Sequence, residues 1–311
     1  MKKATLWYRR GLLFLVIGAV TFFVWKNVSQ IDYSKLSVSW SYMILATCAA
    51  LAFYLLSFAI WRKLSRRFGI QASFVRESQV FFVSQLGKYV PGKLTLLLLR
   101  LDGYRNHSKR NVAIATGVEM IASLSSWCFI VSCLLIFLPL DAPNYIRYTG
   151  IAGFIMLISS LHPKFLKRSV NWVLHLFGKD SIDQSPSYGM MLRFVTVYMV
   201  GGFLQGLVLF FVLNALSPVS FYYYPSITAA YLSAVLIGIA AVFAPGGIGV
   251  REGMLFLALP MIAMIAPKPI IVASVVVTRL LFTLVEVFLG ISSSIIEKVS
   301  SGKQGKRQTR T

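Results

Sequence analysis

Charged residues are scarce in this sequence. They make up 13% of its 311 residues, whereas hydrophobic residues make up 57%. A soluble domain carries about a quarter of its residues as charged side chains. The shortage of charge therefore excludes an ordinary soluble enzyme, and the abundance of hydrophobic residues excludes a disordered chain.

Cysteines and catalytic motifs are scarce as well. The three cysteines, Cys48, Cys128 and Cys133, lie in apolar runs without the paired spacing of a disulfide framework, a zinc site or a redox motif. The sequence has no phosphate-binding P-loop and no nucleophile elbow, and its three histidines lack metal-ligand spacing. We therefore expect no enzymatic activity, no cofactor and no bound metal.

Apolar runs dominate the chain, and most are close to the roughly 20 residues that a membrane-spanning helix needs. The runs cover residues 11–25, 40–61, 112–138, 145–161, 194–216, 227–244, 250–266 and 270–296. We predict an all-α polytopic membrane protein with six to eight transmembrane helices. One integral membrane domain would cover residues 1–300, and residues 301–311 would form a basic cytosolic tail. The first run ends in bulky residues rather than a small-residue cleavage site, so we expect it to be a retained span.

The few charges are mostly positive. The chain has 31 lysines and arginines against 10 acidic residues, which gives a net charge of +21. The basic residues cluster at the N-terminus, in alternate loops and in the tail, as cytoplasmic segments of membrane proteins do. We predict that the protein lies in the cytoplasmic (inner) membrane with both termini in the cytosol. Because topology accounts for the charge, nucleic acid is not expected as a partner.

Two Pro/Gly breaks interrupt the apolar pattern. Residues 74–101 are broken at Pro91 and Gly92 and have basic residues on both flanks, so this stretch begins and ends in the cytosol. We predict a re-entrant hairpin that turns at residues 88–93. The break at residues 244–249 has uncharged flanks and forms either a hairpin from the outside or the turn between two crossings. The hairpin choice gives an inverted repeat with halves 1–143 and 144–300, a pattern found in transporters; the alternative is eight simple crossings.

Several charged residues fall inside the predicted membrane segments. They are Lys88, Lys93, Glu119, Arg251, Glu252, Arg279 and Glu286. Each costs about 2.5–3.5 kcal/mol at the bilayer centre on insertion scales, so we expect them to pair or to face water. Glu119 is predicted to pair with a basic residue of the first hairpin. Arg279 and Glu286 lie two turns apart on one helix face and are candidates for a packing ion pair, and Lys88 and Lys93 could instead extend to the cytosolic interface.

Arg251 follows the second break directly. Proline and glycine end a helix and free backbone groups. The helix that begins after the break would direct its positive dipole end and its unpaired N–H groups into the membrane. With a fixed cation beside them, these groups predict a site for a phosphate or a carboxylate.

The segment GKYVPGK at residues 87–93, followed by Arg100, and the segment PGGIGVRE at residues 245–252 resemble the two signature segments of the lysylphosphatidylglycerol synthase transmembrane-region family. The resemblance covers nearly the whole chain. It implies a flippase-like, lipid-handling domain with re-entrant helices around a central cavity. Carried over by position, the cavity residues would be Lys88, Pro91, Gly92, Lys93, Arg100, Pro245, Gly246, Gly247, Gly249, Arg251 and Glu252.

This family also provides the membrane half of the bacterial multiple peptide resistance factor, where it moves aminoacylated phospholipid between leaflets. The present sequence lacks that factor's soluble aminoacyl-transferase domain, so we expect no synthesis of lysyl lipid.

We predict a membrane lipid translocator for an anionic phospholipid or a polyisoprenoid-linked lipid. Glu119, Arg279 and Glu286 complete its predicted substrate site, and the two glutamates are candidates for proton coupling. The alternative is a non-transporting scaffold that binds lipid and presents it to a membrane-bound enzyme of envelope lipid or glycan biosynthesis. A membrane-embedded transferase is disfavoured, because the sequence has no acidic pair at metal-ligand spacing.

Overall fold

The computed structural model describes residues 38–89, 95–137, 144–161, 168, 187–241, 245–262 and 266–308. Within these ranges every regular element is helical, which confirms the all-α class. The elements are α2 (Trp40–Arg67), α3 (Phe74–Gln85), η2 (Leu86–Tyr89), α4 (Thr95–Gly103), α5 (Lys109–Phe137), α6 (Asn144–Leu161), α8 (Tyr188–Leu216), η3 (Phe221–Tyr223), α9 (Tyr224–Ala240), η4 (Pro245–Gly247), α10 (Val250–Ala258), η5 (Leu259–Met261) and α11 (Lys268–Gln308). The first apolar run and the turn with Pro91, Gly92 and Lys93 lie outside the described residues.

Five helices in the described part of the chain are long and apolar enough to cross a membrane. They are α2, α5, α8, the segment Phe221–Ala240 of η3 and α9, and the segment Lys268–Ser301 of α11. This confirms a polytopic membrane protein. The 18-residue α6 is not among the five, and residues 11–25 are not described, so the total of six to eight spans stays a prediction.

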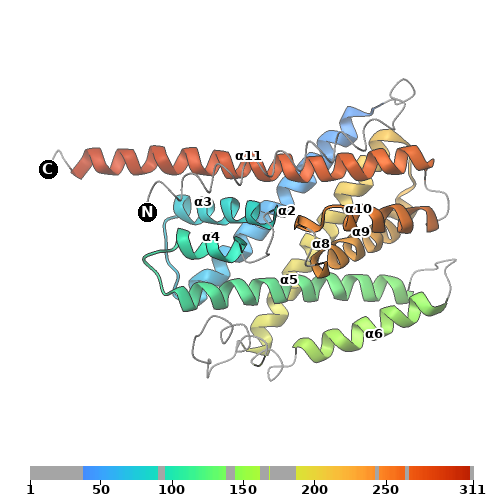
Figure 1. Cartoon of the computed structure of the whole chain (residues 1–311), viewed down its shortest axis with the longest axis horizontal. Coiled ribbons are helices and arrows are strands. Elements are labelled where there is room, and N and C mark those ends of the chain that lie inside the picture. Colours follow the sequence, from blue (N-terminus) through green and yellow to red (C-terminus); the bar gives the residue numbers. More distant parts are fainter. Residues whose placement is uncertain are drawn as a thin grey trace.

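Three of the remaining helices are too short to span a bilayer. At 1.5 Å per residue the 12-residue α3 is about 18 Å long, and the nine-residue α4 and α10 are each about 14 Å long, against a hydrocarbon core of about 30 Å. Figure 1 shows α3 beside α4 and α9 beside α10, so that each pair forms a hairpin. The tips, η2 and η4, meet in the middle of the bundle, and the bases lie at opposite ends (Figure 1).

Leaving α6 aside, the order of the described helices and hairpins is the same in the two halves of the chain. A long helix, a hairpin and a second long helix occur as α2, α3–α4 and α5, and again as α8, α9–α10 and α11. This order agrees with an inverted repeat of residues 1–143 and 144–300, and the repeat itself stays a prediction.

Small residues bring α8 close to its neighbours. A Cβ added to Gly206 would overlap the side chain of Thr228 on α9, and a Cβ added to Gly202 would lie 2.6 Å from Cδ1 of Ile130 on α5. In lipid the association of helices depends on van der Waals packing, which small interface residues permit. Packed against α2, α5, α9 and α11, α8 forms the middle of the bundle.

The outer faces of the long helices are apolar. Leu55 of α2 is 52% exposed, and Leu284 and Phe288 of α11 are 67% and 62% exposed. A soluble protein rarely exposes such side chains together. Their position on the helices that are long enough to span fits contact with lipid.

One end of the bundle is strongly basic. Arg66 and Arg67 end α2, Lys109 and Arg110 begin α5, and the C-terminal part of α11 with Lys298 extends past the bundle at the same end (Figure 1). The base of the first hairpin also lies at this end.

Replacing Gly206 with Ala should lower the free energy of unfolding by about 1–3 kcal/mol, because the added Cβ overlaps Thr228 in a packed interface. Gly189→Ala on the same helix is the control, since an added Cβ there meets nothing within 4 Å. Thermal unfolding in detergent, followed by tryptophan fluorescence, measures both variants. Equal stability of the two variants would contradict the close approach of α8 and α9.

Candidate functional site

The tips of the two hairpins touch each other at the centre of the bundle. A Cβ added to Gly246 of η4 would lie 3.2 Å from Cδ1 of Tyr89 in η2. Gly246, Gly247 and Gly249 have φ angles of +59°, +70° and +83°, which L side chains rarely adopt, so this break needs glycine. Arg279 of α11 donates a 2.9 Å hydrogen bond to the carbonyl of Gly246 and thereby holds the second tip against a long helix.

A cavity of about 270 Å³ lies beside the two tips, and its wall comes from both hairpins together with α2, α5, α8 and α11. The predicted site residues that line it are Lys88, Arg100, Glu119, Gly246, Gly247, Arg251 and Arg279. Aromatic side chains that line it include Phe53, Tyr54, Tyr89, Trp127, Tyr198, Tyr231 and Phe282. The fold therefore brings seven of the fourteen predicted site residues to one cavity, where aromatic side chains surround them.

Glu286 of α11 connects three elements next to the cavity. It forms an ion pair with Lys88 of η2 and accepts a hydrogen bond from the hydroxyl of Tyr54 on α2. Its second oxygen accepts a 2.8 Å hydrogen bond from the hydroxyl of Tyr89. The buried carboxylate is thus satisfied, and the first hairpin tip is fixed to α11.

Arg279 and Glu286 do not form the ion pair that their spacing suggested. The guanidinium of Arg279 lies 3.8 Å from the carboxylate of Glu252 on α10, whereas Glu286 pairs with Lys88. Seven residues along one helix correspond to a rise of about 10.5 Å, so the two side chains reach different hairpins.

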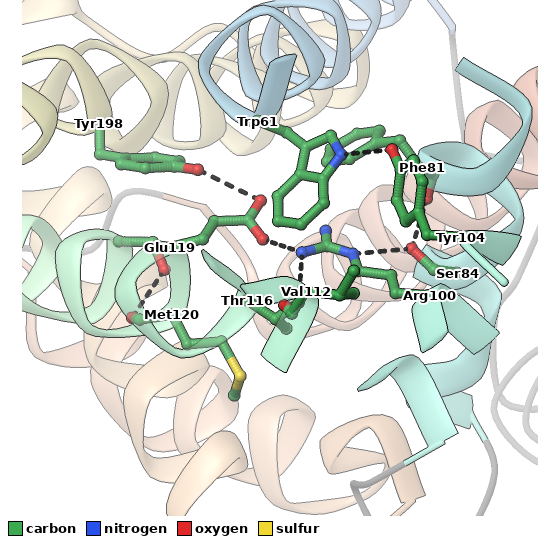
Figure 2. Close-up of polar contacts among 11 residues, drawn as sticks. Trp61, Phe81, Ser84, Arg100, Tyr104, Val112, Thr116, Glu119, Met120 and Tyr198 are labelled. Carbon is green, nitrogen blue, oxygen red and sulfur yellow. Dashed lines mark hydrogen bonds and ion pairs between the residues drawn. The ribbon is translucent and has the colours of Figure 1, made fainter. Parts of the chain in front are cut away.

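A second buried ion pair joins Arg100 of α4 to Glu119 of α5 (Figure 2). The Nε atom of Arg100 donates a 3.2 Å hydrogen bond to Ser84, and the guanidinium carbon lies 3.8 Å from the centre of the Trp61 ring. Tyr198 donates a 3.3 Å hydrogen bond to the other oxygen of Glu119. The Arg100 side chain is fully buried. The structure confirms that Glu119 pairs with a basic residue of the first hairpin.

Arg251 differs from the other cavity cations. Lys88, Arg100 and Arg279 each have a carboxylate partner, whereas Arg251 has no ion pair or hydrogen bond within the described ranges. Its stem packs so tightly on Gly238 of α9 that an added Cβ would overlap Cγ of Arg251. The cluster therefore retains one uncompensated positive charge, at Arg251.

Glu252 occupies the beginning of α10. One carboxylate oxygen accepts a 2.6 Å hydrogen bond from the backbone N–H of Gly249, and the other faces Arg279. A carboxylate at this position offsets the positive end of the helix dipole. The sequence predicted that free N–H groups of this helix would attract an anion; in the structure Glu252 already uses that helix end, and Arg251 supplies the free positive charge.

Four buried N–H groups of cavity-lining residues have no hydrogen-bond partner in the described part of the chain. They are Nη2 of Arg100, Nε1 of Trp127, Nε2 of Gln205 and Nε of Arg251. A buried donor without a partner costs about 1–3 kcal/mol. A ligand rich in hydrogen-bond acceptors and carrying negative charge would supply the missing partners.

Some predicted site residues lie outside the cavity wall. Glu252 and Glu286 lie behind it, bonded to the cations described above. Pro245 is the first residue of η4, and Gly249 precedes α10 without lining the cavity.

The sequence analysis missed the polar side chains that the long helices contribute. Tyr54, Trp127, Tyr198 and Gln205 line the cavity and offer hydrogen-bonding groups. These residues could have been found in the sequence, because each is a polar or amphipathic side chain inside an apolar run. Burying a hydrogen-bonding group in a membrane span costs free energy unless the group has a partner.

The family described as Lysylphosphatidylglycerol synthase TM region matches residues 11–292 of the chain. The matched range contains both hairpins and all residues of the cavity wall. No curated protein matches the chain at the significance required.

Replacing Glu119 with Leu should lower the free energy of unfolding by about 3–5 kcal/mol, because it leaves the buried guanidinium of Arg100 without a carboxylate partner. The double variant Arg100→Met/Glu119→Leu removes both charges and should be more stable than Glu119→Leu alone. Asp102→Leu, which breaks the more exposed pair with Arg105, is the control and should cost less than about 1 kcal/mol. Unfolding in detergent followed by circular dichroism gives the three values, and a double variant no more stable than Glu119→Leu alone would contradict the coupling.

Proposed function

Because the chain belongs to the family of the lysylphosphatidylglycerol synthase transmembrane region, we propose that it is a membrane lipid translocator whose central cavity holds an anionic headgroup. The lipid would be an anionic phospholipid or a polyisoprenoid-linked lipid. The observation that carries this proposal is the cavity wall, where Arg251 is uncompensated and buried N–H donors lack partners.

In the proposed arrangement α2, α5, α8 and α11 cross the cytoplasmic membrane, and the two hairpins, α3–α4 and α9–α10, enter it from opposite faces. The short lengths of α3, α4 and α10 support re-entry, since none of them reaches across the hydrocarbon core. The basic end of the bundle faces the cytosol, because cytoplasmic segments carry an excess of Lys and Arg. The first hairpin then opens from the cytosol, the second opens from outside, and both termini lie in the cytosol.

The headgroup binds through charge and hydrogen bonds together. A phosphodiester carries one negative charge, which matches the single uncompensated charge of Arg251. Its oxygens accept hydrogen bonds from the free donors of Arg100, Trp127 and Gln205. The acyl or isoprenoid tails remain in the lipid beside the apolar outer faces of the long helices.

Movement of the headgroup across the membrane requires the cavity to open to each side in turn. The two hairpin tips are held to α11 by Lys88–Glu286 and by Arg279 with Glu252 and Gly246. A phosphate that enters the cavity competes with these carboxylates for the same cations. We propose that this competition loosens one tip at a time.

The proposal contains no chemical step. Within the described ranges no three His, Cys, Asp or Glu side chains gather to hold a metal ion. The carboxylates at the cavity are each engaged with a cation, which leaves none placed as a free general base.

Arg251→Gln should reduce lipid flipping by about tenfold or more, because a hydrogen bond to a charged group contributes about 1.5–3 kcal/mol. Flipping is measured in proteoliposomes with fluorescent phosphatidylglycerol, using reduction of the outer-leaflet label. Arg251→Lys keeps the charge without the planar donors and should give an intermediate rate. Lys298→Gln, at an exposed position on α11, is the charge-matched control. Wild-type flipping by Arg251→Gln would overturn the site, and binding without flipping by the wild type would favour the scaffold.

Single cysteines at Gln71 and Asn106, which are exposed on either side of the first hairpin, should both react with a membrane-impermeant thiol reagent from the cytosolic face. A cysteine at the exposed Tyr222 of η3 should react from the opposite face. The three native cysteines are replaced with Ser in all variants. Labelling of Gln71→Cys and Asn106→Cys from opposite faces would mean that this stretch crosses the membrane.

A further inference from the structure

A second cavity, of about 340 Å³, lies at the basic end of the bundle between the last turns of α2 and the first turns of α8. The two helices run antiparallel, because the backbone N–H of Ser39 before α2 donates a 2.8 Å hydrogen bond to the carbonyl of Ala215 near the end of α8. The C-terminal turns of α2 therefore lie beside the beginning of α8. This groove shares no lining residue with the central cavity.

Three cations line the groove without carboxylate partners. They are Lys63 and Arg67 of α2 and Arg193 of α8, and none forms an ion pair within the described ranges. The neighbouring Arg62 and Arg66 behave differently, since both turn to Glu77 of α3, at 2.7 Å and 4.0 Å. One face of α2 therefore carries arginines that a carboxylate compensates, and another face carries cations that no described carboxylate compensates.

The groove becomes apolar away from these cations. Leu56 and Ala59 of α2 and Val197 of α8 line it, and Leu56 lies seven residues, or about 10.5 Å along the helix, from Lys63 toward the middle of the bundle. A charged mouth at one end and an apolar floor toward the centre have the polarity of a phospholipid in a leaflet. Basic pockets between transmembrane helices on the cytoplasmic side bind anionic headgroups in this way.

We propose that this groove binds one anionic phospholipid, with its phosphate among Lys63, Arg67 and Arg193 and an acyl chain along Leu56, Ala59 and Val197. The site is separate from the headgroup site at Arg251. The lipid would fasten the end of α2 to the beginning of α8 and would supply the counter-charge that the described residues do not.

Native mass spectrometry of the full chain in detergent, titrated with dioleoyl phosphatidylglycerol, tests this site. Each Lys or Arg near an anionic lipid contributes about 1 kcal/mol, so Lys63→Gln/Arg193→Gln should weaken binding by about thirtyfold. Lys109→Gln/Lys298→Gln removes the same charge at the same end, outside the groove, and should retain the wild-type affinity. The titration is repeated in the Arg251→Gln background, so that phosphatidylglycerol binding in the groove and binding in the central cavity are measured separately.

Ala59→Trp tests the groove without changing its charge. The indole should fill the floor and reduce phosphatidylglycerol binding, whereas Ala52→Trp, two turns earlier on α2 and outside the groove, should not. Three results would overturn the proposal: equal weakening by the groove pair and the control pair, binding of dioleoyl phosphatidylcholine as tight as that of phosphatidylglycerol, or unchanged binding in Ala59→Trp.

Discussion

A charged side chain at the centre of a bilayer costs about 2.5–3.5 kcal/mol unless it pairs or faces water. That cost determines how the centre of this protein is arranged. Lys88 with Glu286, and Arg279 with Glu252, join the two hairpin tips to the same helix, α11. Because both hairpins are fixed to one helix by buried charge, the shape of the cavity between them depends on these two pairs. The aromatic and aliphatic wall then fills the remaining space.

Arg251 has no carboxylate partner among the described residues, whereas the neighbouring cations each have one. Its position is well packed against Gly238, so its lack of a partner does not come from a loose structure. Residues that break a local rule inside an otherwise consistent fold are expected at functional sites. The unpartnered donors of Arg100, Trp127 and Gln205 on the same wall show the same departure. Together these residues give the described part of the wall four N–H donors without an acceptor and one cation without a carboxylate partner.

The long helices and the two breaks could be predicted from the sequence, because apolar runs and Pro/Gly segments are local signals. The sequence could predict that Glu119 pairs with some basic residue of the first hairpin, because a buried carboxylate needs a nearby cation. The partner of Arg279 could not, because spacing within one helix says nothing about which hairpin packs on it. The length of α10 was also hidden: residues 250–266 form one apolar run, but Pro260 falls in the 3₁₀ turn that ends the helix.

A translocator must release the headgroup that it binds. At about 4 Å and an effective dielectric constant of 20, one additional free cation would contribute about 4 kcal/mol to holding a phosphate, which is nearly a thousandfold in dissociation. Glu119, Glu252 and Glu286 compensate every cation among the described residues that line the cavity, except Arg251. A single negative charge then neutralises the site without being trapped there. In the proposed translocator the carboxylates therefore have two effects: they stabilise cations inside the bilayer, and they keep the proposed headgroup site weak enough to empty.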